Sequence, residues 1–561
     1  KLYAALAMQA FPTSSISSEL LTLIRENNDA DPWLRHAGVM ALAAKVQDRE
    51  EFSPLLNDKS PAIRMAALLA VRHSFKRDSE WVGKDAATVD TQAINATMQT
   101  LLRDEQLQIV AEAARVINDL PLEDSFPALA SLAVSLRGPT AATFPEALVR
   151  RIINANYRLG RVENAQRVLA IATEPALSLP IRAEALRTLI DWDQAGPRDR
   201  VTGVWRLPPP AGFAKPVTPR DPEELARFKA FLTENVALIL SGVGNELQPD
   251  ALKLISRYEL PTDDKVFASW VADKSRSIAT QAAALQLLSS RRSPLAADAI
   301  KLALQSDRPL VRAEARDALA VIDPDAATGA LNDVLSHESS TIIERQRALG
   351  TLSKLKTGAA DAILTEWVAR LNGGQVAEAL QLDVIEAVVA RGLPELKSAV
   401  DQFTAKQAEG DLLTRHRSSL FGGDADRGRD VFLGHRTAQC VRCHKVGTSL
   451  VGGNAGPDLN QVATRHDRLS LLQSLVDPSA KIAKGFETVT LVMSNGQVFG
   501  GVIRNESDNE IVLEKPDGAK VTLKVADVDE RSQPKSAMPE MNRNLLPREL
   551  RDLVEFLANQ K

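Results

Sequence analysis

Apolar residues follow a helical period over most of this chain and alternate only in one stretch near its C-terminal end. Over residues 1–412, alanine and leucine recur at helical spacing and a short unit repeats: a turn residue, often proline, then an apolar residue and arginine, then small residues. Proline fits the first turn of a helix because its missing N–H would have no partner there. The unit occurs at Asp31–Ala37, Asp58–Arg64, Leu179–Ala183 and Asp307–Ala313, with a weaker copy at His337–Leu349.

This pattern resembles HEAT repeats, in which pairs of helices stack into a solenoid. Small residues such as Ala313, Ala315 and Ala318 allow stacked helices to approach closely. We therefore predict HEAT-like helical repeats over residues 1–195 and again over residues 223–412. The repeated acidic and arginine residues are expected to bond neighbouring repeats together rather than to form a ligand site.

A proline-rich segment at residues 196–222 interrupts the helical pattern. It contains Gly196-Pro197, the run Leu207-Pro208-Pro209-Pro210 and further prolines up to Pro222. So much proline cannot continue a helix, because proline lacks the N–H group and clashes with the preceding turn. We interpret the segment as an ordered connection between two helical arrays, which serves either as a linker or as a docking segment for a partner.

Residues 413–561 are predicted to form a separate helical domain with a β insertion at about 486–530. Apolar residues alternate in Thr488–Met493 and Val498–Ile503, on either side of Asn495-Gly496, and Asn-Gly between such runs is a strong hairpin signal. Ile511–Glu514 and Lys520–Lys524 predict a second hairpin, with its turn at Pro516-Asp517-Gly518. The predicted fold class is therefore mainly α, a HEAT-like α-solenoid followed by an all-α domain with a small β insertion.

Helices are expected on both sides of this insertion. Helical spacing returns over residues 547–559, where apolar residues form one face. Gly428 and Phe432 lie four positions apart in a predicted short helix, and a glycine at this spacing suits a close helix crossing. We predict that this helix packs against the last one.

The only two cysteines of the 561 residues lie in Cys440-Val441-Arg442-Cys443-His444. The pattern C-x-x-C-H is the attachment site of a c-type haem, with the histidine as an axial ligand of the iron. A zinc site would need four ligands, usually with a second Cys/His pair, and the chain has no further cysteine. A redox dithiol is typical of a βαβ unit, which this pattern lacks. We predict one covalent haem c, held by Cys440, Cys443 and His444.

Two further positions are candidates for contact with such a haem. A histidine that binds a metal is oriented when its other ring nitrogen donates to a carbonyl, and Pro457 after Gly456 offers one. Leu459 is positioned to pack on the ring, although a plain surface turn explains this segment equally well. For the second axial ligand we favour Met538, in the loop Ser536-Ala537-Met538-Pro539, with Met541 as its rival. The other candidates are Met493, His416, His435 and His466.

Residues 422–561 resemble a class I cytochrome c, and the whole chain resembles the PVC-type haem-binding CxxCH proteins, in which HEAT-like helices precede a C-terminal cytochrome. The cytochrome resemblance rests on these residues in this order: Gly428, Phe432, Cys440, Cys443, His444, Gly456, Pro457 and Met538. The PVC-type resemblance rests on Asp191-Trp192, residues 197–203, residues 423–428 and Asp477-Pro478-Ser479. Many members carry an N-terminal β-propeller, which is not in this sequence, so no substrate-oxidising activity is carried over. The chain opens without methionine and in mid-pattern, which is expected of a fragment or a processed chain.

The resemblance implies electron transfer by a haem with His/Met ligation, on a HEAT-repeat scaffold. The expected partner is a redox protein, either a dehydrogenase or another cytochrome, and the expected location is periplasmic or otherwise extracytoplasmic, where bacteria attach haem c. The net charge of −4 offers no basic field for nucleic acid, and no apolar run is long enough to span a membrane. The alternative function is a protein-interaction scaffold with a structural or sensory haem. No dinucleotide fingerprint or nucleophile motif indicates an enzyme.

Overall fold

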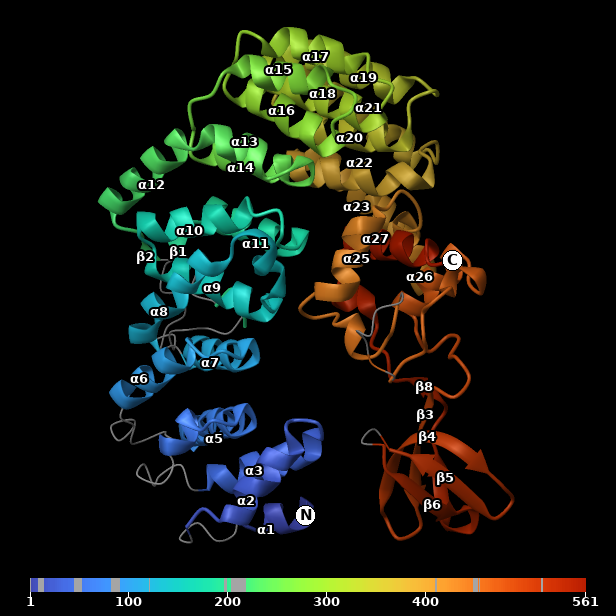
Figure 1. The fold of residues 1–561 in the computed structure, drawn as a ribbon. Coiled ribbons are helices and arrows are strands. Elements are labelled where there is room, and N and C mark those ends of the chain that lie inside the picture. The colour runs from blue at the N-terminus through green and yellow to red at the C-terminus, as the bar shows by residue number, and fades with distance from the viewer. Residues whose placement is uncertain are drawn as a thin grey trace. The chain divides into compact units, whose positions relative to one another are not determined.

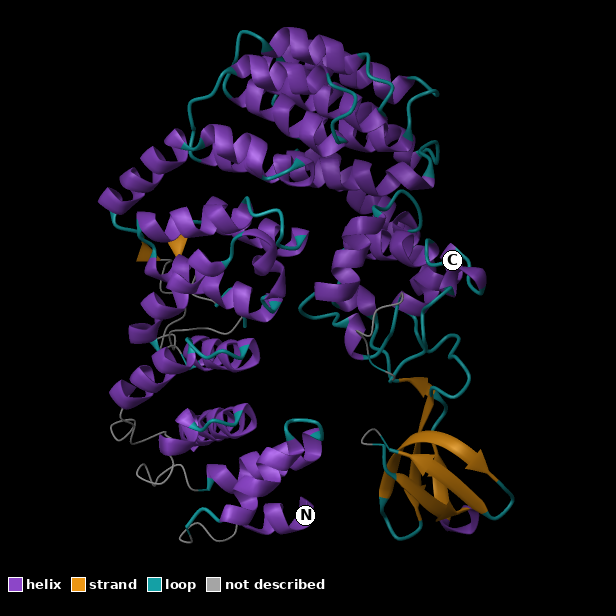
Figure 2. Cartoon of the chain, viewed as in Figure 1, coloured by secondary structure: helices purple, strands orange, loops and turns teal. Residues whose placement is uncertain are grey.

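The computed structural model is mainly helical, with a small β-sheet near the C-terminal end (Figures 1 and 2). Both features confirm the mainly α class and the small β insertion; they do not test the resemblance of the C-terminal part to a cytochrome c. The chain divides into two compact units, Lys1–Leu287 and Leu288–Lys561, and this division falls inside the predicted segment 223–412. No helix among the described residues has the length and apolar character that a bilayer crossing requires. The structure describes residues 2–8, 15–44, 53–81, 91–120, 122–195, 199–202, 218–408, 411–446, 453, 455–515 and 518–561.

Helices of the first unit stack in pairs (Figure 1). A main row, in which each helix packs on the next, runs through α3, α5, α7, α9, α11 and α14, and α2, α6, α8, α10 and α13 lie against its members. This pairing is the HEAT-like arrangement that the sequence predicts. The helices are α1 Leu2–Ala7, α2 Ser18–Asn27, α3 Pro32–Ala43, α5 Pro61–Trp81, α6 Thr91–Leu101, α7 Leu107–Asp119, α8 Phe126–Ser131, α9 Glu146–Leu159, α10 Val162–Ala172, α11 Leu179–Ile190, α12 Pro222–Glu234, α13 Val236–Gly242, α14 Gln248–Arg257, α15 Asp264–Ala272 and α16 Ile278–Ser290, which runs across the division.

The second unit repeats this architecture before its C-terminal part. Its main row is α18, α20 and α22, and α17, α19 and α21 pack against these helices in turn. The apolar side chains between the two layers form one buried cluster that includes Leu349, Leu364 and Val384. The helices are α17 Ala296–Leu304, α18 Pro309–Ile322, α19 Pro324–Ser336, α20 Ile342–Leu352, α21 Gly358–Asn372, α22 Glu378–Arg391, α23 Pro394–Ala408, α24 Leu412–Arg415, α25 Ala425–Gly434, α26 Arg468–Val476 and α27 Pro547–Ala558.

Arginines of the main row pair with carboxylates of the next helix or of the turn before it. The guanidinium of Arg64 bonds both oxygens of Asp104, at 2.6 and 2.9 Å, and Arg312 bonds both oxygens of Glu344, at 2.9 and 2.8 Å. In each case Nη1 also donates to the carbonyl six positions earlier, at 2.8 Å. The prediction that the repeated arginines join neighbouring repeats is confirmed for Arg64 and Arg312, and Arg182 joins them through the backbone carbonyls of Gly242 and Val243. We call the following set the arginine ladder: Arg64–Asp104, Arg72–Glu112, Arg150–Glu184 and Arg312–Glu344.

The two ends of the proline-rich segment meet. Gln194–Ala195 (β1) pairs with Thr218–Pro219 (β2) as antiparallel strands, so the chain leaves and returns at the same place. Arg220 then lies 4.7 Å from the ring centroid of Trp192, and burial lowers the pKa of its guanidinium. The segment is therefore closed at its base rather than stretched between two arrays. Most of its prolines, at residues 197 and 208–216, lie outside the described residues.

The β insertion is an antiparallel sheet of order β6-β5-β4-β3-β7, with β8 also paired to β3. Both predicted hairpins are present: Val492 faces Val498 across the first, Glu514 faces Lys520 across the second, and Gly496 has the positive φ of +82° that the first turn needs. Its own apolar core includes Leu491 and Leu513. Residues 516–517 of the second turn lie outside the described residues. The strands are β3 Glu487–Met493, β4 Val498–Glu506, β5 Glu510–Glu514, β6 Lys520–Lys524, β7 Val528–Arg531 and β8 Lys535–Ser536.

Glu344 supports a test of the arginine ladder. Burial by itself would raise the pKa of this carboxyl, but hydrogen bonds from Arg312, Thr341 and Arg316 outweigh burial and lower the pKa from 4.5 to about 2. A lowered pKa in the folded state stabilises the protein above the unfolded value, and this stabilisation is lost as the pH falls from about 4.5 toward 2.

We expect Glu344→Gln to destabilise the second unit by about 3 kcal/mol at pH 7, because two arginines lose their charged partner. The loss should shrink as the pH falls toward 2. Hydrogen exchange of the backbone amides of α18 and α20, measured from pH 7 downward, tests this. The matched control is Glu366→Gln on α21, whose side chain is 56% exposed in its pair with Arg370 and should contribute little. Equal protection in the two variants would contradict the role given to Glu344.

Candidate functional site

Both cysteines lie at a short 3-10 turn, η8, Cys440–Arg442. The backbone enters this turn through Gln439 with a φ of +46°, and the amide of His444 donates to the carbonyl of Cys440 at 3.0 Å. The thiols are free rather than joined in a disulfide. Cys440 is half-buried, and burial raises the pKa of its thiol to about 11, whereas Cys443 is exposed.

His444 is oriented by the segment that the sequence singled out. Its Nδ1 lies 2.8 Å from the carbonyl oxygen of Pro457, so Nδ1–H donates and Nε2 keeps its lone pair. Burial lowers the pKa of this imidazole, and the hydrogen bond to Pro457 opposes that shift. A Cβ on Gly456 would lie 2.6 Å from Cε1 of the ring. The contact between His444 and Pro457 therefore requires a residue without a side chain between them.

The remaining predicted positions gather at one apolar cluster. Cys440, Leu459 and Met538 are partly buried and pack against the same set of core side chains. Met541, the rival to Met538, is 2% exposed and belongs to that core itself. Met493 is a core residue of the β-sheet, away from the cysteine motif's own apolar cluster. The structure thus brings Cys440, Leu459 and Met538 to one cluster, and His444 and Pro457 to one hydrogen bond.

Helix α25 crosses α27 at Gly428. A Cβ at this position would lie 1.9 Å from the backbone oxygen of Asp552, so the two backbones approach as closely as glycine allows. Phe432, one turn further, packs on Phe556 with ring centroids 5.7 Å apart. The predicted crossing of these two helices is confirmed. Asp552 strengthens it, because its carboxylate accepts from the amide of Asp424 at 2.8 Å and from Nε of Arg427 at 3.0 Å.

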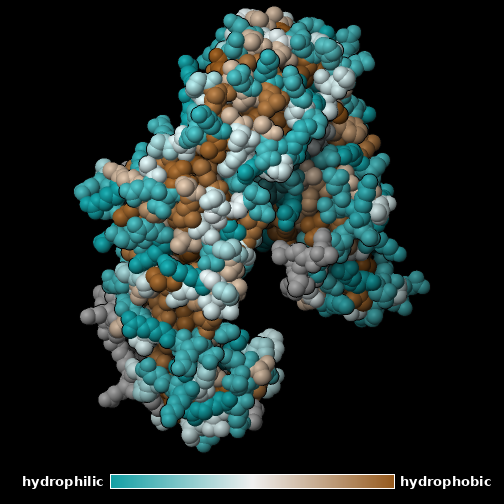
Figure 3. All heavy atoms as spheres, turned by 45° about the horizontal axis from the view of Figure 1, so that its top comes forward, coloured by the Kyte–Doolittle hydropathy of each residue, from teal (hydrophilic) through white to brown (hydrophobic). Residues whose placement is uncertain are grey.

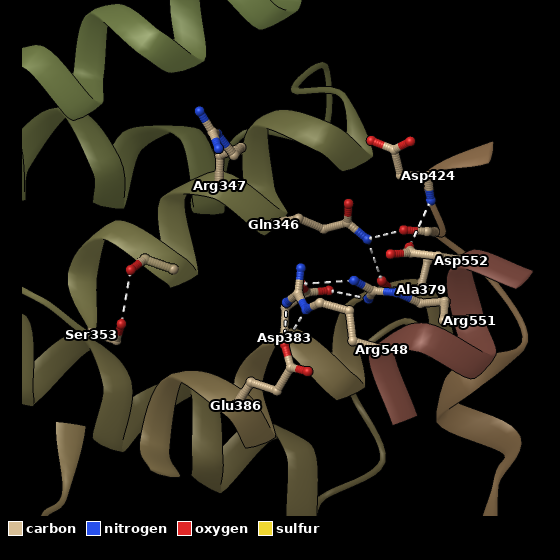
Figure 4. A network of polar contacts seen from close by, with 12 residues as sticks. Gln346, Arg347, Ser353, Ala379, Asp383, Glu386, Asp424, Arg548, Arg551 and Asp552 are labelled. Atoms are coloured by element: carbon tan, nitrogen blue, oxygen red, sulfur yellow. Dashed lines mark hydrogen bonds and ion pairs between the residues drawn. The ribbon is translucent and has the colours of Figure 1, made fainter. Parts of the chain in front are cut away.

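A buried ion-pair network joins α27 to α22, and sequence reasoning did not find it (Figure 4). Nη1 of Arg551 donates to Asp383 at 2.7 Å, and these side chains are 1% and 3% exposed. Arg548 donates to the other oxygen of Asp383 at 3.0 Å and also pairs with Glu386. We call Asp383, Glu386, Arg548 and Arg551 the α22–α27 network.

Gln346 of α20 adds a second connection between the main row and the C-terminal part. Its side-chain amide donates to the carbonyls of Ala379 and Gly422, at 3.0 and 2.9 Å (Figure 4). Gly422 has a φ of +79°, a conformation that favours glycine. A sequence signal for the α22–α27 network existed in α27, where Arg548 and Arg551 are three positions apart and so share one helix face. Nothing in the sequence pointed to Asp383 as their partner.

Comparison with known proteins assigns this chain to no family. No family model matches this chain, and no curated protein matches it. Similar solved structures include Kap121p bound to Pho4p, at 13% identity, a TM-score of 0.41 and coverage of 74% of this chain and 51% of that one. Kap121p itself gives 14% identity, a TM-score of 0.42 and coverage of 78% and 53%. Kap95p with RanGDP gives 16% identity, a TM-score of 0.41 and coverage of 78% and 61%. The chain thus spans between half and two thirds of these structures' length.

The predicted main function, electron transfer between redox partners, is corrected by these findings. Among the described residues, no group of three or more His, Cys, Asp or Glu side chains could hold a metal ion. The described residues before α23 form stacked helix pairs, as in a helical solenoid. The description as an iron-dependent electron carrier of the cytochrome c type is therefore wrong, and the alternative, a protein-interaction scaffold, has the better support.

The α25–α27 crossing can be tested with a matched pair of glycines on α25. We expect Gly428→Ala to destabilise the C-terminal helices by about 3 kcal/mol or more, because its Cβ meets backbone rather than a movable side chain. Gly434→Ala on the same helix meets no atom within 4 Å and should be neutral or slightly stabilising. Thermal unfolding followed by the fluorescence of a dye that binds exposed apolar surface would show this difference. If the two variants melt alike, the crossing is looser than described.

Proposed function

We propose that this chain is a protein-interaction scaffold. The observation that carries the proposal is the arginine ladder, which holds α5 to α7, α9 to α11 and α18 to α20 through hydrogen bonds with little freedom to rearrange. A solenoid of this kind keeps the outer surfaces of successive helices in a fixed order and offers them as an extended binding surface. A protein partner uses such a surface without requiring any catalytic group on it.

The helices of the second unit expose apolar side chains that a partner would cover. Leu302, Val321, Ile342 and Val389 are each between 49% and 62% exposed, and they lie on α17, α18, α20 and α22. On the face seen in Figure 3, hydrophobic residues gather in patches that hydrophilic residues separate. Side chains of this kind favour association because covering them removes apolar surface from water.

The C-terminal helices belong to the scaffold in this proposal. Helix α27 is joined to α22, the last helix of the main row, through the α22–α27 network, and this fixes the part of the chain that carries the cysteines within the second unit. What binds there is presented together with the helical surface, rather than on a separate body at the end of a linker.

The cysteine motif has a separate role in this proposal. A haem c held by Cys440 and Cys443, with His444 and Met538 toward the iron, would be structural or sensory. The free thiols, the available Nε2 of His444 and the apolar cluster beneath Leu459 support such a group. Bound there, the haem ring would add apolar surface to the core. The proposal also includes the resemblance to a class I cytochrome c and an extracytoplasmic location.

We expect a purified partner protein to bind the purified chain directly, whether or not the chain carries the haem. The full chain, used as bait, would first capture the partner, which is then produced separately and titrated by calorimetry. We expect a saturable complex whose dissociation constant is the same for wild type and for the double variant Cys440→Ser, Cys443→Ser, because the binding surface lies on the solenoid. Absence of direct binding between purified components would contradict the scaffold.

Covalent haem can be tested without any activity. After production in a bacterial host that matures c-type cytochromes, denatured wild type should keep a haem, detected by its pyridine haemochrome spectrum and by the mass of the chain. Cys440→Ser with Cys443→Ser should lose it, and a structural haem predicts a lower melting temperature for this variant. Ser474→Ala, on α26, is the control and should keep the haem. A denatured wild-type chain without haem would refute the cofactor.

A further inference from the structure

The contact between α3 and α5 departs from the arginine ladder. Elsewhere in the main row, Arg64, Arg72, Arg150 and Arg312 each have a carboxylate of the following repeat as their partner. Between α3 and α5 the structure has a groove of about 300 Å³ instead. Arg35, His36 and Met40 line it from α3, and Leu69, Arg72 and His73 line it from α5. No carboxylate is among the described residues that line it.

Arg35 occupies the ladder position without a ladder partner. It follows Pro32 by three positions, as Arg64 follows Pro61 and Arg312 follows Pro309. Those two arginines bond a carboxylate with two nitrogens each, but the guanidinium of Arg35 makes no hydrogen bond or ion pair within the described part of the chain. Burial raises the pKa of the Asp29 carboxyl, and the positive charge of Arg35 partly opposes this rise. The two side chains nevertheless form no ion pair.

The lining of the groove combines positive charge with an apolar floor. Arg72 donates one Nη to Glu112 at 2.6 Å, and this contact leaves its other N–H groups for a ligand. His36 and His73 are exposed at the rim, whereas Val39 is buried and Met40 and Leu69 are half-buried at the floor. Methionine adapts to apolar groups of different shape. Such a lining is complementary to carboxylates that flank an apolar side chain.

We propose that the α3–α5 groove binds an acidic peptide segment of a partner protein, in which an apolar side chain lies between carboxylates. The partner's carboxylate takes the place at Arg35 that a carboxylate of the next repeat takes at Arg64 and Arg312. This inference rests on the proposed scaffold function and names the chemistry of one partner.

The test uses the full chain and a fluorescein-labelled peptide containing Glu-Leu-Glu-Leu-Glu, with fluorescence anisotropy as the readout. We expect saturable binding that weakens as salt is added, because the contacts are between charges. Arg35→Ala should weaken binding by about tenfold or more. The matched control is Arg103→Ala, an exposed arginine in the turn after α6, which should leave binding unchanged. Since the guanidinium of Arg35 makes no hydrogen bond or ion pair with any described residue, the variant should melt at the same temperature as wild type.

Two further probes make the proposal falsifiable. A peptide with glutamine in place of every glutamate should not bind; equal binding would show an apolar site and overturn the proposal. Sodium acetate at the carboxylate concentration of the peptide should not displace it; full displacement would show a site for small anions only, and would also overturn the proposal. Equal binding of the peptide to wild type and to Arg35→Ala would likewise overturn the proposal.

Failure here is distinguishable from failure of the scaffold. A purified partner that binds wild type and Arg35→Ala equally well overturns the acidic-peptide site and leaves the scaffold intact. If no protein binds the chain directly, the scaffold itself is refuted.

Discussion

An arginine bonded to a carboxylate of the next repeat is the interaction on which each helical array depends. Moving two charges out of water is costly, and their attraction compensates only when the remaining N–H groups also find partners. Arg64 and Arg312 meet this condition in the same way, with a bidentate carboxylate on one side and a backbone carbonyl on the other. Because a bidentate pair fixes direction as well as distance, it sets how one helix lies on the next.

The α22–α27 network extends this principle to the C-terminal part of the chain. Here the carboxylate of Asp383 lies in the solenoid, and two arginines come from a helix more than 150 residues further along. Helix α27 is therefore joined to the last helix of the main row by these side-chain bonds, and both helices pack on the 3-10 turn Arg417–Ser419 (η7). The other side of the same helix carries the backbone against which Gly428 packs. One helix thus connects the scaffold to the segment that bears the cysteine motif.

The candidate site combines local and distant constraints. His444 and Pro457 are thirteen positions apart, and their hydrogen bond depends only on a short loop and on the missing side chain of Gly456. Met538, which follows the β-sheet in the sequence, packs against the same apolar cluster as Cys440 and Leu459. The β-sheet has a separate apolar core. The strands of the sheet therefore separate the cysteine motif from Met538 in the sequence, but they do not pack into the cluster that these residues share.

The sequence by itself determined the helical repeats, the bonding role of Arg64 and Arg312, both β-hairpins and the pairing of Gly428 with the last helix. These features follow from local rules: helical and alternating periods, proline at a first turn, Asn-Gly in a hairpin and glycine at a close crossing. Only the tertiary structure decided which carboxylate each ladder arginine binds, that Asp383 receives Arg551, that Arg35 has no carboxylate partner among the described residues, and that Gln194–Ala195 pairs with Thr218–Pro219. The reason is physical: a charged side chain looks the same in the sequence whether it is solvated or buried, and its partner is chosen by the packing of helices far apart along the chain.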